Sequence, residues 1–252
     1  GCIASVVFNF GQYALGADAI INMFAAFDIH ISKGLCCLIL LAVSVPLSLM
    51  YGSGENPKGV KIVENAIKVM IGIMLIVFIA VVCVTGINVP AMIKGLLIPK
   101  LPSGIDGMVT LIASMTATIG VMDWLLFNNG MIARGFSEDH ERLGRFDAFC
   151  GGLLPVTLVL SLVSIAFAEA FSGKPGIPTT SSELCEALMG VIPSVWIQAG
   201  FYLGVLAMVL SSMIGLSATC ATSFYQSLNI PRNTKAWYHP LVVLAPQIGC
   251  LG

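Results

Sequence analysis

Charged residues are scarce in this sequence. Only 10% of its 252 residues are Asp, Glu, Lys or Arg, whereas 57% are hydrophobic. A soluble domain usually carries about 25% charged residues, so this chain lacks the polar side chains needed to cover a water-exposed surface. The composition therefore excludes an ordinary soluble domain and predicts an all-α polytopic membrane protein whose main partner is the lipid bilayer. With a net charge of −1, the chain is not expected to bind nucleic acid.

The usual signatures of catalysis are also missing. The sequence has no Gly-rich phosphate-binding loop, no H-E-x-x-H pair and no G-x-S-x-G turn. Its three histidines, His30, His140 and His239, lie near the ends of apolar runs, and no two of them share a helix at ligand spacing. The eight cysteines form no C-x-x-C pair, and most are expected to be small buried hydrophobes. We therefore expect neither an enzyme nor a resident cofactor.

Long apolar runs dominate what is present. A span needs about 20 apolar residues, and it must be helical because lipid offers no hydrogen-bond partner to the backbone. Six runs are long enough, and a seventh begins near Trp237. The expected spans are 3–27, 34–51, 60–89, 107–133, 147–171 and 190–225. Both ends of the sequence look cut, so we interpret residues 1–252 as a fragment of one transmembrane domain.

Positive charge is unequal on the two sides of these spans. Loops after the second, fourth and sixth spans hold seven Lys and Arg residues, whereas loops after the first, third and fifth hold four. Because cytoplasmic loops carry the excess of Lys and Arg, the loops after the even-numbered spans are expected to be cytoplasmic. The compact loops and the absence of an N-x-S/T site favour a multi-pass protein of a bacterial-type inner membrane.

The fourth run carries the densest set of polar groups. Its stretch MTATIGVMDWLLFNNG, residues 115–130, contains one acid, two amides and two helix-weakening glycines. A broken helix exposes carbonyl and amide ends that can hold an ion or a polar substrate. Asp123 would then supply a carboxylate to a cation, Met122 a thioether, and Asn128 and Asn129 neutral oxygens. The alternative is that these groups only form hydrogen bonds with neighbouring helices.

Polar residues also recur along the first run, at Asn9, Gln12, Asp18 and Asn22. Asp18 and Asn22 are four residues apart, so they share one face of a helix. That face either lines a water-filled path or packs against further helices. Gln12, Asp18 and Asn22 are therefore candidate ion-pathway residues.

Four segments resemble the NRAMP-type divalent metal transporter family, and the likeness runs over most of the chain. The span that ends in FDIH is similar to the third helix of the family, and GVKIVENAIKVMIGIMLIVF to the fifth. KGLLIPKLPSG resembles the linker into the sixth helix, and RFDAF the start of the seventh. The chain would then correspond to family helices three to nine. The orientation of the family agrees with the one predicted from Lys and Arg.

The resemblance implies a LeuT-like fold of two inverted repeats, with a divalent metal ion as the substrate between the broken first and sixth helices. TATIGVMDW would be the unwound part of the sixth helix, which makes Ala117, Thr118 and Gly120 substrate-binding candidates beside Met122 and Asp123. In one register Met122 takes the place of the family methionine, which favours manganese or iron. In another register Gly120 takes that place, which favours magnesium.

The resemblance also bears on protons as a second transported ion. The third helix of the family carries acidic residues associated with proton movement, and the alignment places Gln12 and Leu15 at those positions. Neither side chain can carry a proton, so uncoupled or differently coupled transport is favoured, with Asp18 as a nearby substitute. The first helix of the family, with its D-P-G-N motif, would lie before Gly1. Two other functions stay open: a LeuT-fold transporter of an organic solute such as an amino acid, and a non-transporting membrane subunit.

Overall fold

The computed structural model describes residues 2–53, 57–90, 93–94, 105, 107–109, 112, 138–171, 180–231 and 233–251. All regular structure in these ranges is helical, which confirms the predicted all-α fold. The α-helices are α1 (Cys2–Ala25), α2 (Lys33–Ser53), α3 (Pro57–Thr85), α7 (Glu141–Asp147), α8 (Leu154–Ala170), α9 (Ser181–Val191), α10 (Val195–Ser227) and α11 (His239–Leu244). Three tighter or wider helical turns are η1 (Glu138–His140), η2 (Ala148–Leu153) and η3 (Ala245–Leu251).

Four helical stretches of the described chain are long and apolar enough to cross a membrane: Lys33–Met50, Asn65–Thr85, Glu141–Ala168 and Val195–Ser227. They lie at the predicted spans 34–51, 60–89, 147–171 and 190–225. The predicted span at 3–27 is occupied by the 24-residue helix α1, and most of the predicted span at 107–133 lies outside the described residues. The chain is thus a multi-pass membrane protein.

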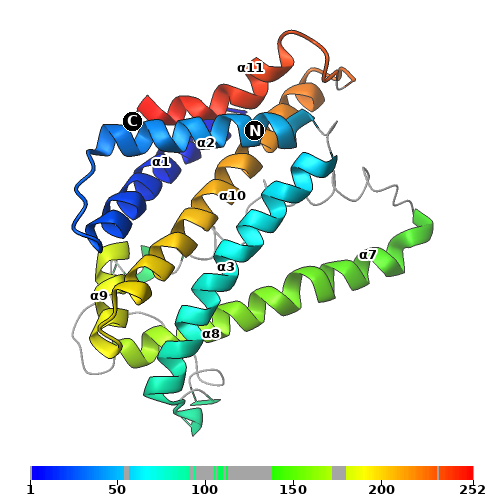
Figure 1. Ribbon diagram of the computed structural model, residues 1–252. Coiled ribbons are helices and arrows are strands. Elements are labelled where there is room, and N and C mark those ends of the chain that lie inside the picture. Colours follow the sequence, from blue (N-terminus) through cyan, green and yellow to red (C-terminus); the bar gives the residue numbers. More distant parts are fainter. Residues whose placement is uncertain are drawn as a thin grey trace.

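Helix α10 lies at the centre of the bundle and is the most buried of these four stretches. It packs against α1, α2, α3, α9 and α11 (Figure 1). Helix α1 runs antiparallel to it, because Cys2 contacts Cys220 at one end and Gln198 contacts Asn22 at the other. Gly16 allows the close approach, since a Cβ atom there would lie 2.8 Å from Leu40 and 2.9 Å from Val209.

Helix α2 and the continuous α11–η3 segment lie across the α1–α10 pair (Figure 1). Both α2 and η3 contact α1 and α10, and they also contact each other. The chain therefore builds a crossing of four elements, with α1 and α10 in one layer and α2 and η3 in the other. This crossing is the most densely connected part of the described chain.

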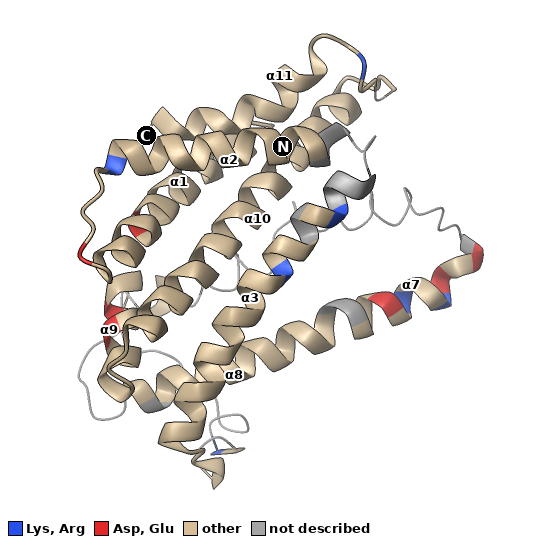
Figure 2. Ribbon diagram, viewed as in Figure 1, with Lys and Arg blue, Asp and Glu red and all other residues tan. Residues whose placement is uncertain are grey.

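On the other side of α10, helix α3 packs against α10 and α8. The outward faces of α3 and α8 carry exposed apolar side chains such as Ile76, Ile79, Val156 and Leu158, as expected for surfaces that face lipid. Charged residues gather on α7, on α9 and in the first half of α3, and Asp18 lies within α1, whereas α10 carries none (Figure 2). The distribution of charge thus matches a bundle embedded in a bilayer.

Aromatic residues mark both ends of α10. Trp196 is exposed at its first turn and contacts Phe27, and Tyr225 packs against Phe224 and Tyr238 at its last turn. The two ends are 29 residues apart (225 − 196), which corresponds to about 43 Å of helix. A bilayer including its headgroups is about 40–45 Å thick, and aromatic belts lie at its two interfaces. Helix α10 is therefore long enough to cross a whole bilayer with its headgroups.

Candidate functional site

Most of the predicted substrate site belongs to the fourth apolar run. Its residues all lie outside the described part of the chain: Ala117, Thr118, Gly120, Met122, Asp123, Asn128 and Asn129. Their role therefore stays a prediction. The three candidate ion-pathway residues, Gln12, Asp18 and Asn22, are described, and all lie on α1.

Asp18 is exposed on the side of α1 that no described helix covers. Ala14 and Gly11, one and two turns earlier, are exposed on the same side, and a Cβ atom at Gly11 would have no neighbour within 4 Å. The opposite side of α1 is buried, with Asn9, Tyr13 and other residues facing the bundle. Both predicted roles of the Asp18 face, as an ion path or as a helix contact, require it to be open in this way.

Asn22 differs from Asp18, although the two share a helical face. Its side chain is half-buried, and Nδ2 donates a hydrogen bond to the backbone oxygen of Asp18 at 2.8 Å. The backbone oxygen of Asn22 accepts a hydrogen bond from Gln198 Nε2 at 2.9 Å. Asn22 therefore holds the end of α1 against the start of α10. Gln12 is half-buried one residue before Tyr13.

The most extensive buried polar group of the described chain surrounds Gln247 in η3. Tyr13 donates its phenolic proton to Gln247 Oε1 at 2.7 Å, and Ser44 Oγ donates to the same oxygen at 2.9 Å. Gln247 Nε2 donates to Ser48 Oγ and to Ser217 Oγ, each at 3.0 Å. One carboxamide thus joins η3 to α1, α2 and α10. Because an amide offers two donors and two acceptor positions, its hydrogen-bonding capacity is filled.

A second contact lies beside the first. Asn9 Nδ2 donates a hydrogen bond to the backbone oxygen of Pro246 at 2.6 Å. The backbones of α1 and η3 are close here, since a Cβ atom at Gly249 would lie 2.8 Å from the carbonyl carbon of Asn9. Asn9 Oδ1 is buried without a hydrogen-bond partner among the described residues. Asn9 and Tyr13 are one turn apart, so α1 is attached to η3 at two successive turns.

The sequence pattern pointed to Asn9 as a polar residue of the first run, but it did not point to Tyr13, Ser44, Ser48 or Gln247. One signal was present: Gln247 is an amide inside the last apolar run, WYHPLVVLAPQIGCLG, and a polar group inside a span indicates a partner. Ser44 and Ser48 are four residues apart on α2, which is the spacing that places two side chains on one face. Their common partner could not be read from that spacing.

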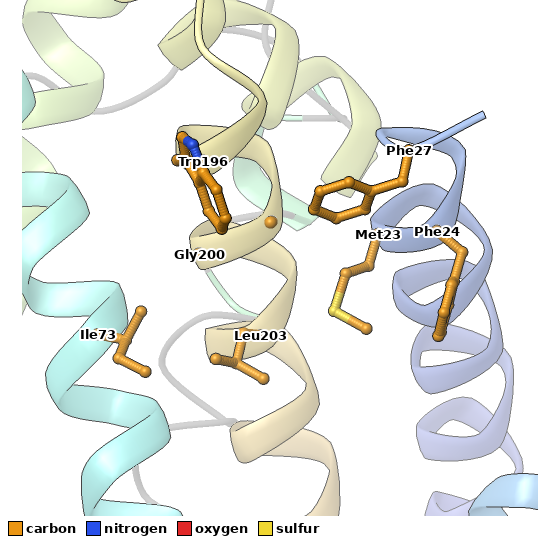
Figure 3. Close-up of a pocket in the computed structure, with 8 residues that line it drawn as sticks. Met23, Phe24, Phe27, Ile73, Trp196, Gly200 and Leu203 are labelled. Atoms are coloured by element: carbon orange, nitrogen blue, oxygen red, sulfur yellow. The ribbon is translucent and has the colours of Figure 1, made fainter. Parts of the chain in front are cut away.

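The apolar pocket in Figure 3 is chemically different. It has a volume of about 350 Å³ and lies between the end of α1, α3 and the start of α10. Its lining is Met23, Phe24, Phe27, Ile73, Trp196, Ala199, Gly200 and Leu203. These side chains offer no oxygen ligand for a hard cation such as Mg²⁺. The pocket is therefore not a candidate ion site.

The acidic and sulfur side chains of the described residues are dispersed. In the described ranges no three His, Cys, Asp or Glu side chains come together as metal ligands. Cys185 of α9 is buried against the bundle, and this burial raises the pKa of its thiol to about 11, although a hydrogen bond from Tyr202 acts in the opposite direction. A thiol in that state is a packing group rather than a metal ligand at neutral pH.

Comparison with known proteins identifies the family. A family model described as natural resistance-associated macrophage protein-like, abbreviated Nramp, matches residues 3–251. Comparisons with curated proteins and with solved structures gave no match. Members of the Nramp family are membrane transporters of divalent metal cations with the LeuT fold, so the predicted resemblance and fold are confirmed. Because the match covers nearly all of its residues, the chain belongs to the Nramp family.

Proposed function

We propose that this protein carries divalent metal cations across a bacterial-type inner membrane by alternating access, without moving protons in the same cycle. The observation that carries the proposal is the family match over residues 3–251. Transporters of this kind bind an ion near the middle of the bilayer, where broken helices expose backbone carbonyls. The stretch at 115–130 has the glycines, amides and carboxylate that such a site needs.

Asp123 is the proposed charged ligand of the metal ion. Its carboxylate, together with the side-chain oxygens of Asn128 and Asn129, suits Mg²⁺ or Mn²⁺. If Met122 also contacts the ion, its thioether favours Mn²⁺ or Fe²⁺ over Mg²⁺. Replacing Met122 by Ala therefore separates the two registers: selectivity moves toward Mg²⁺ if the thioether is a ligand and stays the same if Gly120 occupies that position.

Independence from protons is supported by the chemistry of the α1–η3 contact. The α1 side chains there, Asn9 and Tyr13, are neutral, and Gln247 is an amide. A proton relay inside a membrane bundle uses Asp, Glu or His side chains. Asp18, the only acidic residue of Cys2–Ala25, is exposed on the other side of α1. The described contact thus contains no Asp, Glu or His side chain, and Asp18 is the one acidic group of α1 through which a proton-coupled mechanism would have to run.

The test measures metal and proton movement together. The intact protein is placed in liposomes that contain a metal-sensitive dye and, in parallel, a pH-sensitive dye. We expect saturable influx of at least one of Mg²⁺, Mn²⁺ and Fe²⁺, no acidification, and at least a tenfold loss of influx in Asp123→Ala. Asp139→Ala is the matched control, because Asp139 is exposed in the short turn η1. Metal influx with acidification would overturn the uncoupled mechanism, and no metal influx by folded protein would overturn the proposal as a whole.

A further inference from the structure

The four partners of the Gln247 side chain come from three helices and have one chemical feature in common. Tyr13, Ser44, Ser48 and Ser217 are all hydroxyl residues, and a hydroxyl can donate or accept a hydrogen bond. The carboxamide is 4% exposed, and the four hydroxyl residues are buried with it. A leucine in its place would fill a similar volume but leave these hydroxyls without their common partner. The group therefore depends on hydrogen bonds at position 247 and not only on its size.

The attachment of α1 to η3 also fixes how α1 is rotated. Asn9 and Tyr13 bind η3 from two successive turns, and Gly249 allows the two backbones to come close. Asp18 follows Tyr13 by five residues, which is a rotation of about 140° around the helix axis. When Tyr13 is held toward Gln247, Asp18 must point away from the crossing. The exposed position of Asp18 and the buried position of its neighbour Ala17 agree with this geometry.

We propose that Gln247 is a positioning residue for transport: by holding Tyr13, it sets the rotation of α1 that presents Asp18 on the open face. The proposal rests on the proposed function, because Asp18 matters only if that face belongs to the ion path. Gln247 itself does not touch the ion. It acts on the rate at which ions pass the Asp18 face and not on the affinity of the site at 115–130.

The first experiment measures metal influx into liposomes for Gln247→Leu and for the matched control Gln226→Leu, whose native side chain is exposed at the end of α10. We expect the maximal rate of Gln247→Leu to fall about tenfold while its KM changes less than twofold, and the control to equal the parent. Gln247→Glu should recover the rate to within about threefold, because all four hydroxyl partners can donate to or accept from a carboxyl group.

The second experiment observes the rotation directly and does not depend on transport. In a folded parent without native cysteines, Asp18→Cys and Ala17→Cys are labelled with a charged, water-soluble thiol reagent. We expect position 18 to react at least ten times faster than position 17, and this ratio to fall below threefold when Gln247→Leu is added. If Gln247→Leu does not fold, it is replaced by Ser48→Ala, which removes one acceptor of the Gln247 amide. We then expect the labelling ratio of positions 18 and 17 to fall in the same direction but by less.

The outcomes separate this inference from the proposed function. A parent protein that moves no divalent metal contradicts the proposed function, whatever the labelling ratio. A folded Gln247→Leu variant with the parental rate and the parental labelling ratio overturns the positioning role. A change in KM with an unchanged maximal rate also overturns it, because the effect would then lie at the binding site.

Discussion

Two buried contacts in this bundle use different chemistry. The crossing of α1, α2, α10 and η3 is held around a carboxamide, with Tyr13, Ser44, Ser48, Ser217 and Gln247 as its members. The seam between α3, α8 and α10 is apolar, and its members are Met74, Val77, Phe78, Val81, Phe167, Phe201 and Gly204. Both share α10, so one helix presents a polar side to the crossing and an apolar side to the seam.

The difference shows how a membrane protein can fix one contact more strictly than another. Hydrogen bonds tolerate a narrow range of distance and angle, so the crossing specifies the rotation of each helix. Each pair of apolar atoms in contact contributes only about 0.1–0.2 kcal/mol, and this attraction depends less on direction than a hydrogen bond does. Lipid adds no hydrophobic driving force between helices, and the seam therefore depends on the fit of its side chains. We expect the seam to supply more energy and the crossing more geometric definition.

The largest effect is expected at the seam, for Phe78→Ala. Phe78 is 2% exposed, and its ring centroid lies 5.4 Å from that of Phe167 and 6.5 Å from that of Phe201. Removing the ring should lower the free energy of unfolding by about 3 kcal/mol, because it leaves a cavity whose lining side chains lose their contacts with the ring. The measurement is unfolding by SDS in mixed micelles. Ile76→Ala, on the exposed face of the same helix, should change stability by less than about 0.5 kcal/mol, and equal losses would contradict the seam as a packed core.

The next effect is expected in the crossing, for Gly249→Ala. The added methyl group would lie 2.8 Å from the carbonyl carbon of Asn9 and 2.9 Å from the backbone nitrogen of Phe10. Backbone atoms cannot rotate away as a side chain can, so η3 must move away from α1. This movement should lower the free energy of unfolding by about 1–3 kcal/mol. Gly72→Ala is the control, because a Cβ atom there meets nothing within 4 Å and alanine favours a helix by about 0.5–1 kcal/mol. A Gly249→Ala variant as stable as the parent would show that the α1–η3 contact is loose.

The helices of the bundle could be predicted from the sequence because lipid leaves the backbone little choice. An apolar run of sufficient length must be helical, and the described spans follow the predicted runs closely. The lateral arrangement was not predictable in the same way. Gln247 and Tyr13 are 234 residues apart, and no local periodicity relates them.

The hydroxyl members of the crossing were hidden for another physical reason. A Ser or Thr inside a helix can bond to the carbonyl four residues earlier, as Thr157 does with Leu153 and Thr85 with Val81. Sequence alone therefore does not distinguish such a residue from Ser48 or Ser217, which bond across helices. Of the predicted site, Asp18 was found on an open face, whereas the Asp123 region lies outside the described residues and stays a prediction.

A smaller effect is expected for Tyr13→Phe, which sharpens the comparison from the polar side. The change removes one of the two hydroxyls that donate to Gln247 Oε1, and Ser44 still donates to that oxygen. Hydrogen bonds between helices in membranes contribute about 0.6 kcal/mol on average, so the loss should be well below that of Phe78→Ala. Ser161→Ala is the control, because its hydroxyl bonds to Thr157 within the same helix. A loss above about 2 kcal/mol would mean that the crossing also supplies most of the stability.

The smallest effect on stability is expected from ionisation of the Cys185 thiol, which belongs to a third contact, that of α9 with α10. Burial raises the pKa of the Cys185 thiol from its ordinary value of 9.0 to about 11, so the folded protein holds the proton more tightly than the unfolded chain does. The contribution of this thiol to stability is complete below pH 9 and is lost as the pH rises toward 11. At pH 8 the folded protein has about one hundredth of the thiolate of the unfolded chain. Alkylation of Cys185 by N-ethylmaleimide, followed by mass spectrometry, should therefore be at least 100-fold slower in native micelles than in SDS. Equal rates would mean that the α9–α10 contact opens readily, and that only the crossing and the seam hold α10 in place.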